Sequence, residues 1–286
     1  MKYFITGGSG LLGERIAAVA SDDDKLVLSH NSNPRNNTVK CDITSEDEVK
    51  KVINRENPDV IIHCAAMTNV DLCEDEVDLA YKINGDATGF LAKASKEVNA
   101  KMIYVSTDFV FDGSKGYYSE SEECNPLGIY AKSKYAGELQ LQKYCDNWAI
   151  GRVSVLYGWH ERLNFTSWVV NELREGNEIN IVTDQINSPT LADNAAEALF
   201  EIARQDKNGI FHTAGNDAIN RFDFTRKVAE EFELDANLIN PTTSEKFVQK
   251  APRPRDSSLS VKKVEKVLGM KMETSTESLM RMARIE

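Results

Sequence analysis

A tyrosine and a lysine four positions apart give the clearest chemical signal in this sequence. Tyr130 and Lys134 belong to the run YAKSK, and on a helix they share one face. A tyrosine with an ordinary pKa near 10 is a poor acid–base catalyst at neutral pH, but a neighbouring ammonium group favours the phenolate and lowers that pKa. The pair therefore predicts acid–base catalysis, with Tyr130 as the acid and Lys134 as its partner.

A hydroxyl side chain follows the predicted strand that comes before this helix. Thr107 stands in the run STD, and its hydroxyl is expected to hold a substrate carbonyl oxygen beside Tyr130. Tyrosine and lysine are ordinary residues on helices. The prediction therefore rests on the three residues together, in order behind a glycine-rich turn.

That turn lies near the start of the chain. The sequence TGGSGLLG places Gly7, Gly10 and Gly13 where a short apolar strand ends and a helix begins. Glycines at such a junction let backbone amides approach a pyrophosphate at the positive N-terminus of the helix. The spacing G-x-x-G-x-x-G is the variant used by short-chain dehydrogenases, so the turn predicts a dinucleotide site.

The end of the second strand indicates which dinucleotide is preferred. An acidic residue there would bind both ribose hydroxyls and repel a 2′-phosphate, but the segment reads SHNSNPR. We therefore expect Ser32 and Arg35 to receive a 2′-phosphate, which favours NADP(H) and leaves NAD(H) possible.

Two later strand ends complete the predicted cofactor site. Asp42 and Ile43 follow the third strand and are expected to flank the adenine. Ala65 and Ala66 follow the fourth strand and are expected beneath the nicotinamide, where small side chains permit close packing.

The elements that must position these residues alternate between strand and helix. Strands are expected at 2–6, 25–29, 39–43, 59–63, 101–106 and 148–153, and helices at 11–20, 45–56 and 131–144, with a long helix ending near 98. Such alternation predicts a parallel sheet. After Gly158 the alternation loosens, and 241–256 is expected to be a loop.

We therefore predict an α/β fold with a doubly wound Rossmann sheet in residues 1–158 and a smaller α/β substrate lobe in 159–286. Some segments of the second part are expected to return to the Rossmann sheet.

Composition excludes several other classes of protein. The 286 residues are 41% hydrophobic and have a net charge of −11, which disfavours binding to nucleic acid or to anionic membranes. No apolar stretch is long enough to span a bilayer, and the first residues lack the apolar segment of a secretory signal, so a cytoplasmic location is expected. The five cysteines lack C-x-x-C spacing and the four histidines are scattered, so no metal site is expected.

Further motifs, in order along almost the whole chain, resemble the dTDP-4-dehydrorhamnose reductase family of extended short-chain dehydrogenases. They are PDVIIHCAAMTNVDLCE at 58–74, STDFVFDG at 106–113, YAKSK at 130–134, RVSVLYG at 152–158 and DQINSPT at 184–190. The resemblance implies an NADPH-dependent reductase that converts a nucleotide-linked 4-keto-6-deoxy sugar to dTDP-L-rhamnose. Hydride would come from the nicotinamide and the proton from the tyrosine.

The same resemblance implies further roles. It places Gly10, Leu11 and Leu12 at the pyrophosphate and Thr68 near the nicotinamide. Thr107 would stabilise the developing oxyanion and, with Asp108, contact the sugar. A homodimer is a possible assembly.

Three departures from the family pattern concern the substrate. Phe109 replaces the usual tyrosine of S-T-D-Y, Val155 replaces a sugar-facing tryptophan, and Asn187 begins the turn that reads G-x-P-T elsewhere. The pocket should therefore be wider and more apolar than rhamnose requires. The changes also resemble the regulatory beta subunit of methionine adenosyltransferase, so a non-catalytic NADP-binding regulatory subunit is the alternative prediction.

Overall fold

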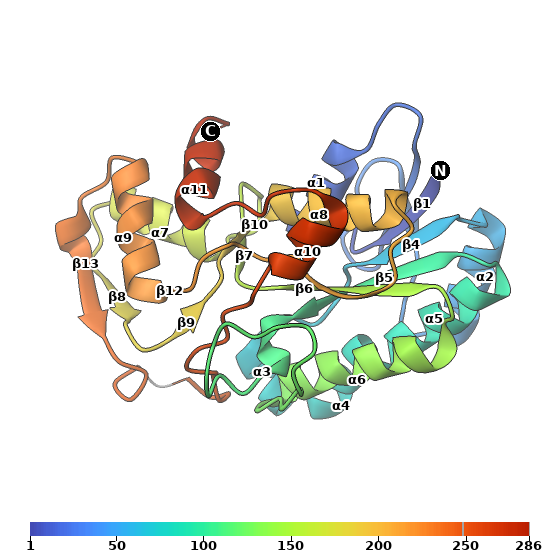
Figure 1. Ribbon diagram of the computed structural model, residues 1–286, viewed down its shortest axis with the longest axis horizontal. Coiled ribbons are helices and arrows are strands. Elements are labelled where there is room, and N and C mark those ends of the chain that lie inside the picture. The colour runs from blue at the N-terminus through green and yellow to red at the C-terminus, as the bar shows by residue number, and fades with distance from the viewer. Residues whose placement is uncertain (248, 286) are drawn as a thin grey trace.

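Parallel strands form the central sheet of the computed structural model, which describes residues 1–247 and 249–285 (Figure 1). The strands are β1 (Lys2–Thr6), β2 (Lys25–His30), β3 (Thr38–Lys40), β4 (Val60–His63), β5 (Lys101–Thr107), β6 (Trp148–Val153) and β11 (Gly209–His212). Their order across the sheet is β11-β6-β5-β4-β1-β2-β3. The order reverses between β1 and β4, which is the switch point of a doubly wound sheet, so the predicted Rossmann fold is confirmed.

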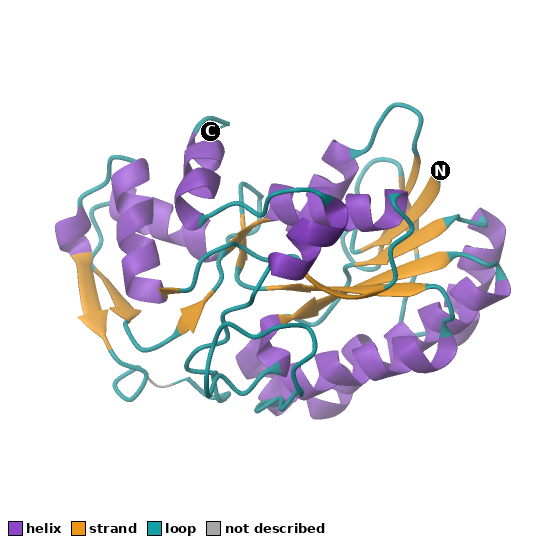
Figure 2. Ribbon diagram, in the orientation of Figure 1, coloured by secondary structure: helices purple, strands orange, loops and turns teal. Residues whose placement is uncertain are grey.

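Helices cover both faces of this sheet, as Figure 2 shows in purple. They are α1 (Leu11–Val19), α8 (Ala192–Arg204) and α10 (Lys262–Leu268) on one face, and α2 (Glu46–Glu56), α5 (Ala87–Glu97) and α6 (Ile129–Tyr144) on the other. The strands are apolar toward both layers because both of their faces are covered: Ile5 and Ile62 pack into one core, Phe4 and Ile61 into the other.

A second lobe has its own core. It contains α7 (Phe165–Arg174), α9 (Arg221–Glu231), α11 (Ser275–Ala283) and the short 3-10 helix η3 (Ala236–Leu238). Its short strands are β7 (Leu156–Tyr157) paired with β10 (Thr190–Leu191), β8 (Ile179–Val182) with β13 (Ile239–Thr242), and β9 (Ile186–Asn187) with β12 (Ile219–Asn220). Tyr157, Val169, Phe224 and Leu279 are buried together at its centre.

The second half of the chain also contributes to the Rossmann layer. β11 pairs with β6, with Phe211 opposite Gly151, and α8 packs on the same face of the sheet as α1. The chain therefore passes from one lobe to the other more than once, and residues from both halves reach the boundary between the lobes.

Two expectations about elements were wrong. The region between β4 and β5 is divided into α3 (Val70–Asp75), α4 (Val77–Tyr81), the π-helical turn η1 (Lys82–Asp86) and α5, instead of one long helix. The expected loop at 241–256 begins inside β13, where Pro241 is tolerated because β13 pairs only with β8. α10 and α11 were not predicted.

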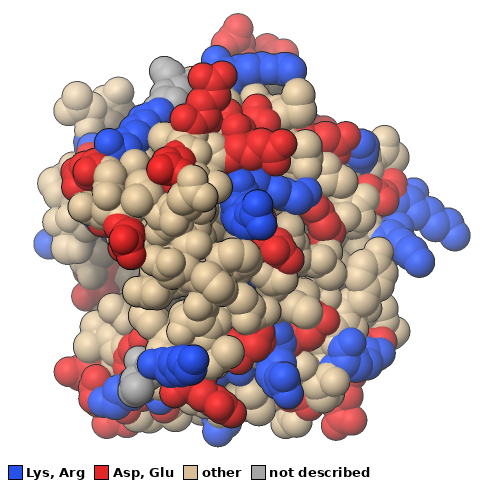
Figure 3. All heavy atoms as spheres, turned by 90° about the vertical axis from the view of Figure 1, so that its left-hand side faces the viewer, with Lys and Arg blue, Asp and Glu red and all other residues tan. Residues whose placement is uncertain are grey.

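The outer end of the second lobe has a mixed charge. Figure 3 shows Lys and Arg side chains interspersed with Asp and Glu on this face, with uncharged surface between them. Within the described ranges, no helix is both long and apolar enough to cross a bilayer.

Candidate active site

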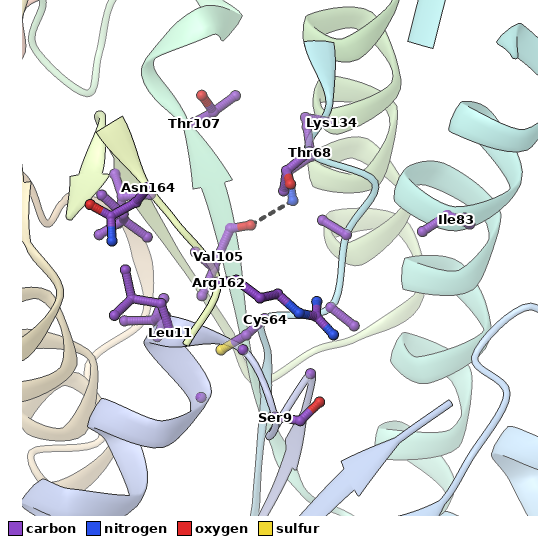
Figure 4. Close-up of a pocket in the computed structure, with 18 of the residues that line it drawn as sticks. Ser9, Leu11, Cys64, Thr68, Ile83, Val105, Thr107, Lys134, Arg162 and Asn164 are labelled. Carbon is purple, nitrogen blue, oxygen red and sulfur yellow. Dashed lines mark hydrogen bonds between the residues drawn. The ribbon is translucent and has the colours of Figure 1, made fainter. Parts of the chain in front are cut away.

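A cavity of about 660 Å³ follows the carboxyl ends of the sheet strands and is closed on one side by residues of the second lobe (Figure 4). Most of the predicted site residues line it: Gly7, Gly10, Leu11, Leu12, Gly13, Ser32, Ile43, Ala65, Ala66, Thr68, Thr107, Asp108, Tyr130, Lys134 and Val155. Arg35 and Asp42 are not among its lining residues. The fold thus brings together the ends of six strands, β1 to β6, and the start of two helices, α1 and α6.

The glycine turn after β1 has the geometry of a phosphate loop. Gly7 has a φ of +66°, and a Cβ there would lie 2.9 Å from the Ala65 nitrogen. A Cβ on Gly13 would lie 2.4 Å from the Gly7 oxygen, so glycine permits the close packing of α1 on the turn. Gly10 is the N-cap of α1, and a Cβ placed on it would meet only the Gly7 oxygen. The first amides of α1 therefore stand open to an anion, and the residues present fit a dinucleotide.

Arg35 is held by acidic side chains outside the cavity. Its guanidinium lies 3.4 Å from Glu14 and forms a second ion pair with Glu161, which belongs to the loop before α7. Of the two residues that were expected to receive a 2′-phosphate together, Ser32 lines the cavity and Arg35 does not.

Asp42 stabilises a local turn. Its carboxylate accepts hydrogen bonds from the Thr44 amide at 2.9 Å and the Thr44 hydroxyl at 2.8 Å. These bonds lower the pKa of Asp42. Ile43 and Thr44, on either side of this turn, line the cavity instead.

Tyr130 and Lys134 come from the first turns of α6 and face the cavity together. The Lys134 amine donates a hydrogen bond to the Val105 carbonyl at 2.7 Å, drawn as a dashed line in Figure 4. Burial lowers the pKa of Lys134 to about 7.

The pKa of Tyr130 is shifted opposite to the expectation. Burial raises it, and an interaction with the Thr107 hydroxyl opposes that rise only in part. The charged groups that act on this pKa are Asp108 and Cys73, and the Lys134 amine is bound to the Val105 carbonyl. Tyr130 is therefore protonated at neutral pH in this state.

Thr107 begins a buried hydroxyl network at the end of β5. Its hydroxyl donates to Asp108 at 3.0 Å, and the other oxygen of Asp108 accepts from Ser154 at 2.8 Å and from Ser257. Burial raises the pKa of Asp108, which is 2% exposed. The network fixes the position of Thr107 beside Tyr130.

Val155 has a strained backbone. Its φ is +40°, in the left-handed region that a β-branched residue rarely adopts. Strain of this kind tends to persist where surrounding structure enforces it, often at functional sites. Phe109 meets the Tyr130 ring edge-on with ring centres 6.0 Å apart. Together, Val155 and Phe109 give the cavity an apolar wall beside Tyr130.

Sequence reasoning gave no role to three polar residues, of which one is buried beside α6 and two line the cavity. Asn84 in η1 is buried and donates to Ser133 of α6 at 2.9 Å, while its side-chain oxygen accepts from the Met67 amide at 2.9 Å. It thereby ties the segment after β4 to α6. Arg162 and Arg221 reach the cavity from the second lobe. Nothing in the local sequence marked the two arginines.

No cluster of three or more His, Cys, Asp or Glu side chains able to hold a metal occurs in the described part of the chain.

Comparison with known proteins gives a consistent picture. The family model described as RmlD substrate binding domain matches residues 1–285. The probable low-salt glycan biosynthesis reductase Agl14 of Haloferax volcanii is 33% identical over 98% of this chain and 96% of its own length. A dTDP-4-dehydrorhamnose reductase of Mycobacterium tuberculosis is 34% identical, covering 91% and 84% of the two chains.

A subunit of another enzyme is similar at nearly the same level. Methionine adenosyltransferase 2 subunit beta of Danio rerio is 31% identical over 96% of this chain and 87% of its own.

Among solved structures, dTDP-4-dehydrorhamnose reductase of Bacillus anthracis in complex with NADP superposes with a TM-score of 0.92. It is 31% identical and covers 100% of this chain and 99% of its own. With the glycine turn, the Tyr130–Lys134 helix and the two-lobed cavity in place, these matches confirm the resemblance drawn from the motifs: the chain belongs to the RmlD family.

Proposed function

We propose that this protein is an NADPH-dependent reductase of a nucleotide-linked 4-keto-6-deoxy sugar, with dTDP-4-dehydrorhamnose as substrate and dTDP-L-rhamnose as product. The observation that supports this most strongly is the placement of Thr107, Tyr130 and Lys134 on the wall of one cavity that also contains the glycine turn. The dTDP-4-dehydrorhamnose reductases similar to this chain support the choice of substrate.

A nicotinamide held at the glycine turn and the cavity wall would supply the hydride for the keto carbon. Tyr130 holds the proton that the carbonyl oxygen needs, because burial raises its pKa and keeps the phenol protonated. In our proposal the Thr107 hydroxyl, which donates to Asp108 in this structure, turns to donate a second hydrogen bond to the same oxygen when the sugar binds. Phe109 and Val155 keep water from this side of the reacting carbon.

Lys134 has two tasks in this proposal. Its amine lies between the Val105 carbonyl and the cavity, so it can orient a ribose hydroxyl of the cofactor. With a pKa of about 7, it can also pass a proton toward Tyr130 once the phenol has given up its own.

The preference for NADPH rests on the adenosine end of the cavity. Ser32 and Asn33 line it after β2, with no Asp or Glu among the described lining residues there. Arg162 follows Glu161, whose ion pair with Arg35 holds this loop beside the end of β2. Figure 4 shows the Arg162 side chain directed into the cavity, so Arg162 is our candidate for the 2′-phosphate.

Replacing this arginine tests the assignment. Arg162→Ala should weaken NADPH binding about tenfold, the value of one charge-assisted contact, and should change NADH binding little. The measurement is titration of each cofactor by nicotinamide fluorescence. Arg35→Ala is the matched control: if it alone removes the preference for NADPH, Arg35 leaves its acidic partners on binding and Arg162 is not the phosphate ligand.

The activity itself is tested by adding dTDP-4-dehydrorhamnose to protein and NADPH and following the absorbance of the nicotinamide. Oxidation well above background supports the reductase. Tight NADPH binding without oxidation, together with association with a methionine adenosyltransferase, would favour the regulatory alternative to which the relative in Danio rerio points.

Assembly and location remain sequence predictions. Exposed apolar side chains on α4 and α6, among them Val77, Leu79 and Leu139, are consistent with a homodimer. Light scattering on the purified protein would measure the assembly. A cytoplasmic location would put the enzyme in the compartment that supplies NADPH.

A further inference from the structure

Arg221 is a cation on the lining of the cavity. It is the first residue of α9, where Asn220 caps the helix by accepting from the Asp223 amide at 2.8 Å. Its guanidinium carbon lies 4.8 Å from the centre of the Phe165 ring, which holds the side chain against the cavity wall. In residues 1–247 and 249–285 the guanidinium forms no ion pair and no side-chain hydrogen bond.

The surroundings of Arg221 leave its charge uncompensated. Burial lowers its pKa to about 10, and Asp108 is the acid that acts against this shift. Asp108 forms no ion pair with Arg221, and its oxygens instead accept hydrogen bonds from the hydroxyls of Thr107, Ser154 and Ser257. A buried charge is costly unless it is paired, so this site favours an anionic ligand.

A second arginine near Arg221 already has an acidic partner. Arg253 acts on Arg221 as a like charge, while its own guanidinium is bound to Asp71 at 3.0 Å. Arg253 is thus neutralised locally, and Arg221 is the donor that remains free to bind a ligand.

The position of this cation relative to the reacting group indicates which anion it binds. Tyr130, Asp108 and Arg221 line the same cavity, and Arg221 enters it from α9 of the second lobe. In a nucleotide sugar, the keto carbon C4 and the phosphate-bearing carbon C1 lie on opposite sides of one pyranose ring. A sugar that spans this cavity with its C4 oxygen at Tyr130 can therefore present its first phosphate to Arg221.

We propose that Arg221 binds the sugar-linked phosphate of the nucleoside diphosphate and so sets the position of the keto group at Tyr130. This assignment rests on the proposed function, because it takes the substrate to be a nucleotide sugar. Two parallel N–H donors of a guanidinium match two phosphate oxygens, which a lysine cannot reproduce. Arg221 is a positioning residue that does not touch the reacting carbon.

The test is calorimetric titration of dTDP and of thymidine into the protein saturated with NADP⁺. Arg221→Met keeps an apolar stem against Phe165 and removes the charge. It should weaken dTDP binding about 10-fold to 100-fold and leave thymidine and NADPH binding unchanged. Arg221→Lys should recover only part of the loss. Arg226→Met, an exposed position on the same helix, is the matched control for net charge and should bind dTDP like the parent.

Three results would overturn the assignment. They are a dTDP affinity in Arg221→Met within twofold of the parent, an equal loss of dTDP and thymidine affinity, or a parent protein that binds dTDP no more tightly than thymidine. The failure of the proposed function looks different: dTDP binding would depend on Arg221, yet the parent would oxidise no NADPH with the 4-keto sugar.

Discussion

Tyr130→Phe should lose about 10²-fold to 10⁴-fold in kcat while its fold and its affinity for NADPH stay close to those of the parent. The phenol is the proton donor in the proposed reaction, and phenylalanine keeps the ring that meets Phe109 edge-on. The hydroxyl contributes little to folding because its interaction is with Thr107, which retains its bond to Asp108. The measurement is turnover of the 4-keto sugar at saturating NADPH, with thermal unfolding in parallel.

A second buried tyrosine provides the control. Tyr118 lies outside the cavity lining, and its hydroxyl donates to Asp112 at 2.8 Å. Tyr118→Phe should lose about 1 kcal/mol of stability, the value of one hydrogen bond, and should keep the parent kcat. A Tyr130→Phe variant with full activity would refute the role of Tyr130. So would a variant that loses stability as Tyr118→Phe does and loses activity only to the extent that it unfolds.

Lys134→Met should lose about 10²-fold or more in kcat/KM. At pH 6 its free energy of unfolding should nevertheless be higher than that of the parent, so the variant should be more stable. The amine is 3% exposed, and burial lowers its pKa from 10.5 to about 7. Between these two pH values the unfolded state binds more protons than the folded state, so the stability of the parent rises with pH. The variant therefore exceeds the parent in free energy of unfolding most strongly below pH 7. This difference shrinks by up to about 1.4 kcal/mol per pH unit as the pH rises toward 10.

Denaturant unfolding of parent and variant at pH 6, 8 and 9.5 measures this difference. If Lys134 served only to hold α6 on β5 through Val105, the variant would be less stable than the parent at every pH. The variant would then show no excess in free energy of unfolding that shrinks as the pH rises. Activity lost together with stability gained is the signature of a residue retained for chemistry.

Much of the fold followed from local signals in the sequence. Apolar runs such as VIIH at 60–63 and the glycine turn after β1 define a parallel sheet because strand, turn and helix are each encoded within a few residues. The residues at the strand ends were therefore identified as cavity residues, and most of them line it. The division of the long helix was not visible, since it depends on Asn84 inserting between Met67 and Ser133.

What the sequence could not predict depends on contacts between distant segments. Arg35 and Glu161 are far apart in the chain, so their ion pair and the entry of Arg162 into the cavity arise only in the folded protein. The same holds for Arg221, which meets Phe165 and Asp108 through the packing of α7 and α9. The pKa of Tyr130 was misjudged because spacing on a helix shows which side chains are neighbours, but not how deeply they are buried.

The central claim is that this cavity transfers hydride from NADPH to C4 of a nucleotide-linked 4-keto sugar. The most direct measurement uses NADPH carrying deuterium at C4 of the nicotinamide, with the product sugar analysed by NMR. We expect the deuterium of one face of the nicotinamide to appear at C4 of dTDP-L-rhamnose, one label for each NADPH consumed. Unlabelled sugar from a protein that nevertheless binds NADPH and dTDP-4-dehydrorhamnose would contradict it.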